Sequence, residues 1–201
     1  MKNDLIHQST EYDCGPTCLV NALRRLFDRA EIPPGVIHRI WLMGNDACCA
    51  EGREGCRGTS RAAMRYMADW LREYGETGGF PVDAAYLSGE DAVVAPGSRA
   101  WAWLQEGGCA VMRCFAGKIP HYVLLTALLP EGEVGLFDPY AETPVFREPG
   151  RRIVAGEPKK MNRAVRFPLL NREDTADYAM GETAARELVL IRRTDGKHNQ
   201  T

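Results

Sequence analysis

The sequence has no apolar run long enough to cross a membrane, and its first residues lack the apolar core of a signal peptide. It also lacks a strong charge of one sign, because the formal net charge of its 201 residues is only −2. No basic stripe alternates with aromatic residues, so the composition gives no general attraction to nucleic acid or to an anionic membrane. Internal repeats, low-complexity tracts and clear linkers are missing too, and we expect one cytoplasmic domain.

A disulfide framework is not expected either, because the seven cysteines are odd in number and the chain is not small. A reducing compartment fits best, and a secreted form that has lost its signal peptide is the alternative. Cys48, Cys49 and Cys56 do not have a standard zinc-ligand spacing and show no evident fourth ligand, so we expect no metal. Cys14 and Cys18 stand one residue too far apart for a redox C-x-x-C pair, which makes Cys18 a packing residue.

Hydrophobic periodicity predicts an α+β chain in which most helices precede most strands. Helices are expected over 15–29, 36–43, from 59 or 60 to the glycines at 75–79, in a short stretch capped by Ser98, and over 172–180. Strands are expected over 80–87, 109–115, 119–129, 133–137 and 187–192, while 141–171 carries no clear pattern. A helical half, about 1–106, would then pack on an antiparallel sheet half, about 107–195, followed by a polar tail at 196–201.

The stretch from Gln8 to Pro16 carries the strongest chemical signal. It is polar, turns at Cys14-Gly15-Pro16 and runs into an apolar segment with helical period, where Pro16 suits the first turn. Cys14 therefore falls at or just before a helix N-terminus, where free N–H groups and the helix dipole favour the reactive thiolate. The Gln8 amide, six positions upstream, could donate to an oxyanion. Taken alone, Cys14 could also be an inert buried thiol.

A cysteine nucleophile needs a base, and the four histidines stand at 7, 38, 121 and 198. His121 opens the predicted strand 119–129, and Asp138 ends the predicted strand 133–137. A hairpin turning near 130–132 would bring these two residues side by side, within a slip of one or two positions. His7, close to Cys14 in sequence, is the weaker rival. The plain alternatives are a sheet-edge histidine and a turn aspartate.

Three motifs follow one another in the chain: QSTEYDCGP at 8–16, HYVL at 121–124 and FDPY at 137–140. Their order and spacing resemble the papain-like cysteine peptidases, and within them the double-glycine leader peptidases that process bacteriocins, with their stand-alone relatives. The resemblance covers roughly residues 5–140. The chain departs from it in having no fused transporter segment and in two apparent additions, the loop with Cys48 to Cys56 and the stretch 141–171.

The resemblance implies a papain-like fold and hydrolysis of a peptide bond, and it suggests a cut after a Gly-Gly motif. Cys14 would attack a carbonyl carbon, His121 would move the proton, and Asp138 would orient the imidazole. The Gln8 side chain and the Cys14 backbone N–H would meet the oxyanion. The implied partner is a peptide or protein substrate, and no cofactor or metal is required. Two alternatives stay open: acyl transfer or glutamine deamidation by the same triad, and a module that binds a leader peptide without cutting it.

Overall fold

Helices and an antiparallel sheet make up the computed structural model, which describes residues 4–48, 57–141, 145, 146 and 148–196. The helices span Cys14–Leu26 (α1), Pro34–Met43 (α2), Arg61–Thr77 (α3), Arg99–Gln105 (α4) and Phe167–Leu170 (α5). The strands span Val82–Ser88 (β1), Cys109–Ala116 (β2), Ile119–Leu129 (β3), Glu133–Phe137 (β4), Arg151–Ile153 (β5), Arg163–Arg166 (β6) and Glu187–Arg193 (β7). The fold class is α+β.

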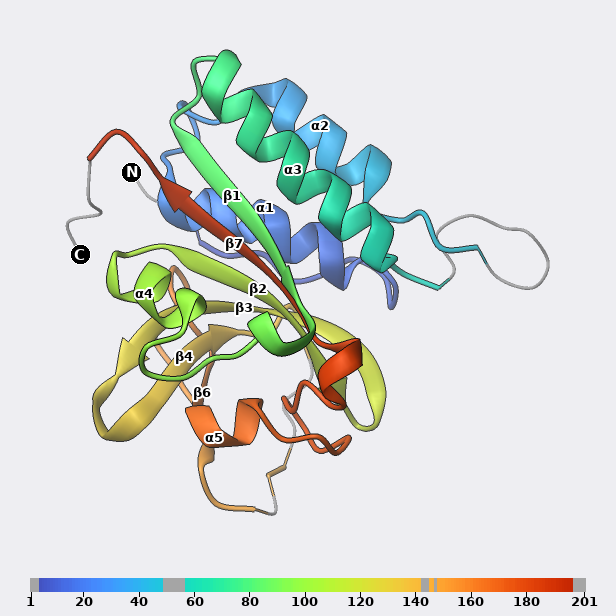
Figure 1. Ribbon diagram of the computed structural model, residues 1–201, viewed down its shortest axis with the longest axis vertical. Helices are drawn as coiled ribbons and strands as arrows, with labels where there is room; N and C mark the ends of the chain where they lie inside the picture. The colour runs from blue at the N-terminus through green and yellow to red at the C-terminus, as the bar shows by residue number, and fades with distance from the viewer. Residues whose placement is uncertain (1–3, 49–56, 142–144, 147, 197–201) are drawn as a thin grey trace.

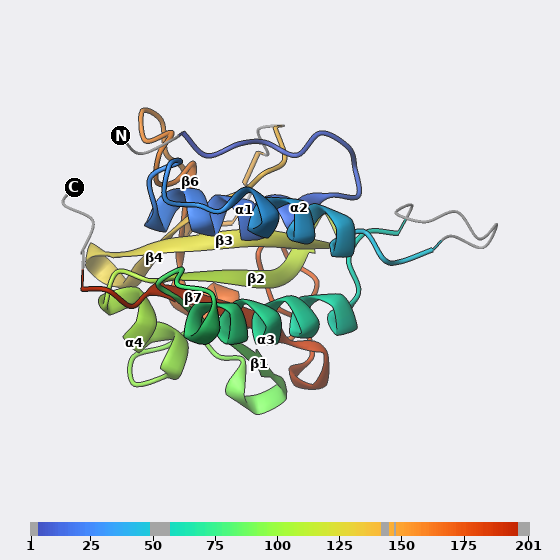
Figure 2. The same ribbon diagram turned by 90° about the horizontal axis from the view of Figure 1, so that it is seen from above.

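The seven strands form one sheet in the order β1-β7-β2-β3-β4-β6-β5, and every neighbouring pair is antiparallel. Helices α1, α2 and α3 cover one face, and α4 and α5 lie on the other (Figures 1 and 2). Along β3, Tyr122 and Leu124 enter the core beneath α1, whereas Val123 and Leu125 enter the core on the α4 side. Because both faces of the strand are buried, its sequence is a nearly continuous apolar run.

Helix α1 lies between the sheet and the N-terminal segment, which crosses its outer side in Figure 2. The Asn21 amide fixes this segment, accepting from the Ile6 N–H at 2.9 Å and donating to the Ile6 carbonyl at 2.8 Å. The helix starts at Cys14 and ends at Leu26, three residues before its predicted end. It stops there because Phe27 adopts an extended backbone and packs its ring 4.5 Å from that of Phe80.

Several predicted boundaries are confirmed by side-chain contacts. Ser60 caps α3 by accepting from the Ala63 N–H, and Ser98 caps α4 by accepting from the Trp101 N–H. The predicted strands appear, with small shifts at their ends. The sheet also takes in residues from the expected helical half, because β1 pairs with β7 at one edge. The stretch that carried no clear pattern contains β5, β6 and α5.

The helix predicted over 172–180 is wrong, because this segment forms turns. The Asp174 side chain accepts from the Ala176 N–H, and such a local bond competes with a helix, while the Asp177 side chain accepts from the remote Gly117 N–H. Tyr178 then has a positive φ of 63°, and the segment pairs with the end of β2. The Tyr178 N–H donates to the Phe115 carbonyl at 2.7 Å, and the Phe115 N–H donates to the Ala179 carbonyl at 3.0 Å.

A buried carboxylate joins the start of β7 to the middle of the sheet. Glu187 is 1% exposed and accepts hydrogen bonds from the hydroxyls of Tyr122, at 2.6 Å, and Tyr86, at 2.7 Å. Arg61 and Arg113 approach the same carboxylate at 3.8 and 3.9 Å. Because buried charges need such partners, this cluster fixes the position of β7 against β1 and β3.

Gly75 lies inside α3, although the sequence suggested that it closes the helix. A Cβ atom there would lie 1.8 Å from the Val82 carbonyl oxygen, so α3 and β1 can pack this closely only around a glycine. We expect Gly75→Ala to lower the free energy of unfolding in urea by about 1–3 kcal/mol through overpacking. Gly35→Ala in α2 is the matched control, since a Cβ there meets nothing within 4 Å. Equal effects of the two substitutions would contradict this packing argument.

Candidate active site

The loop before Cys14 is organised by the buried carboxylate of Asp13. Its Oδ2 accepts from the Ser9 N–H at 3.2 Å and its Oδ1 from the Thr10 N–H at 3.0 Å. The Asp13 carbonyl accepts from the Thr17 N–H at 3.0 Å, which starts the hydrogen bonding of α1. Cys14 is therefore the first residue of α1, directly after the buried Asp13. Its place at a helix N-terminus agrees with the prediction from the sequence.

The Cys-Gly-Pro turn packs directly against two other segments. A Cβ on Gly15 would lie 2.3 Å from Thr59 Oγ1, and a Cβ on Gly44 would lie 2.6 Å from the Cβ of Pro16. The Thr59 hydroxyl donates a short hydrogen bond to the Gly44 carbonyl, which joins the two segments. The N-terminus of α1 thus has no room for a side chain after Cys14. Steric contact with Thr59 therefore explains why a glycine occupies position 15.

The β3–β4 hairpin brings His121 and Asp138 together, as the sequence spacing predicted. Leu124 pairs with Phe137 in the ladder, and the two flanking ends of the strands run on side by side. His121 Nε2 lies 2.8 Å from Asp138 Oδ1. The Cys14 side chain lies close enough to His121 to help raise the pKa of the imidazole. Since Nε2 is occupied by Asp138, Nδ1 is the ring nitrogen left for the thiol.

Asp138 is held by residues that the sequence reasoning did not find. Its Oδ1 also accepts from the Tyr140 N–H at 2.9 Å, and its Oδ2 accepts from the Tyr178 hydroxyl at 2.9 Å. Asn162 brackets its backbone, accepting from the Asp138 N–H and donating to the Asp138 carbonyl, both at 2.8 Å. Tyr178 and Asn162 lie 40 and 24 positions downstream, in stretches whose local sequence carries no signal for this contact.

Burial and hydrogen bonding act in opposite directions on this buried pair. Burial alone would raise the pKa of Asp138, but the hydrogen bond and charge of His121, with the Tyr140 N–H and the Tyr178 hydroxyl, lower it. Burial alone would lower the pKa of His121, but hydrogen bonds to Asp138 and Cys14 and their charges raise it to about 10. At neutral pH His121 is therefore an imidazolium beside the Cys14 sulfur, the arrangement that activates cysteine nucleophiles.

The neighbouring cysteines have a different environment. Cys18 donates its thiol to the Tyr122 carbonyl at 3.3 Å, and burial raises the pKa of its thiol well above the ordinary value. Burial does the same to Cys114, which pairs with His121 across the β2–β3 ladder. Both stay as neutral thiols, which agrees with the prediction that Cys18 is a packing residue. None of the five described cysteines forms a disulfide bond.

The side chain of Gln8, the predicted oxyanion donor, is engaged within its own loop. Its Nε2 donates to the Thr10 carbonyl at 2.8 Å, and its Oε1 is buried without a hydrogen-bond partner among the described residues. The Gln8 N–H donates to the Pro139 carbonyl at 2.9 Å, which joins the loop to the residue after Asp138. His7, the rival base, donates from Nδ1 to the same carbonyl at 3.1 Å and packs on the Phe137 ring.

Two negative findings apply to the part of the chain that the structure describes. None of its His, Cys, Asp and Glu side chains gather in threes that could hold a metal ion. None of its helices is long and apolar enough to cross a membrane. Cys49 and Cys56, two of the three loop cysteines considered as zinc ligands, lie outside the described residues.

The chain is similar to two solved structures of peptidase domains. The peptidase domain of Streptococcus ComA, a bifunctional ABC transporter involved in quorum sensing, gives a TM-score of 0.46 at 12% identity, covering 94% of this chain and 98% of that one. The peptidase domain of Streptococcus mutans ComA gives a TM-score of 0.41 at 10% identity, with coverage of 94% and 98%. No protein-family model and no curated protein matches the sequence. A likeness of this size concerns the fold at most, so the chemistry has to come from the geometry of the site.

The raised pKa of His121 can be measured in an NMR titration of the histidine rings. We expect His121 to stay protonated through neutral pH and to lose its proton near pH 10. Asp138→Asn removes the carboxylate charge, so the pKa of His121 should fall toward the ordinary value of 6.5. A wild-type ring that titrates near 6.5, or a midpoint that ignores the substitution, would contradict the charged pair.

The same pKa shift predicts how stability depends on pH. Because the pKa of His121 is raised on folding, its contribution is fully present below about pH 6.5 and is lost as pH rises through about 10. The lowered pKa of Asp138 acts at the acid end, where stability falls as the carboxylate becomes protonated below its ordinary value of 3.8. Urea unfolding across pH should show both losses in the wild type, and Asp138→Asn should remove most of the alkaline one.

Proposed function

We propose that this protein is a cysteine peptidase that uses Cys14 as nucleophile, His121 as general acid and base, and Asp138 as the residue that orients the imidazole. The observation that carries the proposal is the buried hydrogen bond between His121 and Asp138, with the Cys14 side chain close enough to act on the imidazole. All three residues are less than 9% exposed: Cys14 starts α1, His121 lies in β3 and Asp138 directly follows β4. A buried cysteine, histidine and aspartate gathered in this way are typical of thiol hydrolases.

The reaction follows from the charges of these three residues. The Cys14 thiolate attacks the carbonyl carbon of the peptide bond, and the carbonyl oxygen takes the negative charge of the tetrahedral intermediate. The C–N bond then breaks as the His121 imidazolium gives its proton to the leaving amine, which leaves a thioester on Cys14. A water molecule attacks the thioester as His121 takes its proton, the C–S bond breaks, and the product acid leaves with the Cys14 thiolate and the His121 imidazolium restored. Asp138 balances the charge of His121 whenever the imidazole is protonated.

An oxyanion site completes the proposal. The Cys14 N–H belongs to the first turn of α1, where N–H groups lack partners inside the helix. The Gln8 amide stands in the adjoining loop, tied by its backbone to the Pro139 carbonyl, and turning its Nε2 away from the Thr10 carbonyl would free a second donor. The resemblance of the sequence motifs favours a peptide cut after Gly-Gly. A thiol nucleophile also has to stay reduced, which favours the cytoplasm.

Alkylation of the cysteines tests the nucleophile without a substrate. We expect Cys14 to react with iodoacetamide faster than Cys48, although Cys48 is exposed and Cys14 is only 7% exposed. His121→Gln should slow the labelling of Cys14 and leave that of Cys48 unchanged, because only Cys14 depends on the imidazolium. Mass spectrometry locates the label, and circular dichroism checks that the variant is folded. Labelling led by Cys48 and indifferent to His121 would overturn the proposal.

Hydrolysis of peptides that contain Gly-Gly gives the activity. Cys14→Ala should abolish cleavage, and His121→Gln should lower kcat about 100-fold or more. Adding an amine such as hydroxylamine separates the alternatives, because an acyl-transfer enzyme would accumulate the amine adduct. Tight peptide binding by the wild type without turnover would instead indicate a leader-binding module.

The role of Gln8 is tested by Gln8→Ala. If its amide stabilises the oxyanion, kcat should fall roughly 100-fold while KM changes little, since the donor acts in the transition state. Glu11→Ala, an exposed position in the same loop, is the matched control and should leave kcat unchanged. An unchanged kcat for Gln8→Ala would assign the oxyanion to other donors.

A further inference from the structure

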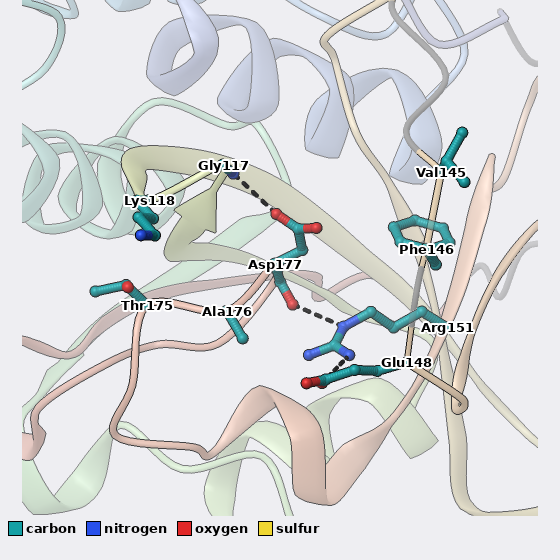
Figure 3. A pocket seen from close by; sticks show the side chains of 9 residues that line it. All are labelled: Gly117, Lys118, Val145, Phe146, Glu148, Arg151, Thr175, Ala176 and Asp177. Atoms are coloured by element: carbon teal, nitrogen blue, oxygen red, sulfur yellow. Dashed lines mark hydrogen bonds and ion pairs between the residues drawn. The ribbon is translucent and has the colours of Figure 1, made fainter.

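A cavity of about 320 Å³ lies beside the turn that joins β2 to β3 (Figure 3). Its lining includes Gly117 and Lys118 from that turn, Arg151 at the start of β5, and Asp177 next to Tyr178. Phe146 and Glu148, from the stretch that the sequence left unassigned, complete this set. The proposed catalytic chemistry uses none of these side chains.

Arg151 is the unusual group in this cavity. Its side chain is only 3% exposed, and two of its three nitrogens are engaged. Nε donates to the Asp177 carbonyl at 2.9 Å, and Nη1 donates to Glu148 Oε2 at 3.0 Å. Nη2 is buried without a hydrogen-bond partner among the described residues, and Figure 3 shows it directed away from Glu148, toward Ala176. A buried charged donor without an acceptor is costly, and so it indicates a missing acceptor.

A second cation lines the cavity. Gly117 and Lys118 have φ values of 55° and 71°, and the Gly117 N–H donates to Asp177 Oδ1 at 2.8 Å, which fixes the turn. The Lys118 side chain is exposed and makes no ion pair with the described residues. It lies on the other side of Asp177 from Arg151 (Figure 3).

The acidic groups in and around the cavity already have donors. Glu148 is shared by Arg151 and Arg172, each at 3.0 Å, and Asp174 pairs with Arg172. Asp177 accepts from the Gly117 N–H. The unmet demand is therefore on the donor side, at Arg151 Nη2 and Lys118. A carboxylate satisfies a guanidinium edge better than any neutral acceptor does.

The cavity is one aromatic layer away from the proposed triad. Phe146 packs edge-on against Tyr178 with ring centroids 5.9 Å apart, and the Tyr178 hydroxyl donates to Asp138. The turn that carries Lys118 leads into β3 just before His121. Two aromatic rings thus connect the cavity to Asp138, and the turn that lines it continues into the strand that carries His121.

We propose that this cavity is a substrate subsite for a carboxylate, either an acidic side chain or the terminal carboxylate of the peptide, which accepts from Arg151 Nη2 and is attracted by Lys118. This proposal rests on the proposed peptidase function, because it names a class of substrate for that peptidase. Carboxylate binding can nevertheless be measured without turnover, so the binding test is independent of the peptidase activity.

The test follows the Gly117 backbone N–H and the Arg151 Nε–H by NMR while three small probes are added. N-acetylglutamate α-amide carries a side-chain carboxylate, N-acetylglutamine carries a terminal carboxylate, and N-acetylglutamine α-amide carries neither. We expect saturable shifts with at least one of the first two and none with the third, and the tighter of the two identifies the source of the carboxylate. Absence of a saturable shift with both carboxylates would overturn the proposal.

Three variants locate the binding. Arg151→Met should weaken binding of the carboxylate probe about tenfold or more, as expected for the loss of a charge-assisted hydrogen bond. Lys118→Ala, at an exposed turn and so without risk to folding, should weaken it about two- to fivefold. Arg152→Met is the matched control, because Arg152 is exposed and pairs with Glu133 on β4. Binding that neither Lys118→Ala nor Arg151→Met weakens, or that Arg152→Met weakens equally, would overturn the assignment.

Cleavage assays then connect the subsite to catalysis. In a peptide that the wild type cuts, glutamate in place of glutamine at the matching position should raise kcat/KM about tenfold, and Lys118→Ala should reduce this preference. Cleavage without the preference would overturn the subsite and leave the peptidase intact. Carboxylate binding at Arg151 with an unreactive Cys14 would overturn the peptidase and leave the anion site intact.

Discussion

The hydrogen bond between His121 and Asp138 is the interaction on which the site depends. A carboxylate and an imidazole are both buried here, and neither charge would be tolerated without the other. Asp138 meets this demand with three donors to its side chain and with Asn162 on both sides of its backbone. One residue, Asp138, therefore ties together the loops that supply Tyr140, Asn162 and Tyr178.

Cys14, the proposed nucleophile, is placed by contacts separate from the His121–Asp138 pair. Steric contact fixes Gly15 against Thr59, and Asp13 holds the preceding loop through backbone N–H groups. The loop is joined to the sheet side by one backbone bond, from Gln8 to Pro139. The helical part is thus fixed at the site by packing and by the hydrogen bonds of Asp13, and the sheet part by the hydrogen bonds of Asp138.

Local patterns in the sequence were enough for most of the elements before residue 141, for β7 and for the His121–Asp138 pair. The start of α1 at Cys14, the caps at Ser60 and Ser98, and the hairpin that joins His121 to Asp138 all depend on residues close in sequence. Asn162 and Tyr178 could not be found in this way, because each acts on Asp138 from far along the chain. The helix expected over 172–180 failed for the same reason: pairing with β2, a remote partner, replaced the local pattern. Arg151 lay in a stretch without any pattern, and only the fold shows that it is buried.

The place of β7 in the sheet determines when the fold can form. This last strand lies between β1 and β2 and is the only partner of β1 among the described strands, and it carries Glu187, which binds the hydroxyl of Tyr122 beside His121. A chain leaving the ribosome can pair β2, β3 and β4 early, but β1 has no place in the sheet until the last of the described strands has emerged. Pairings so distant in sequence slow folding, because a long loop must close before any contact is gained. Tyr178 lies shortly before β7 in the chain, so we expect the nascent chain to acquire its proposed catalytic geometry only when this part of the sequence has emerged.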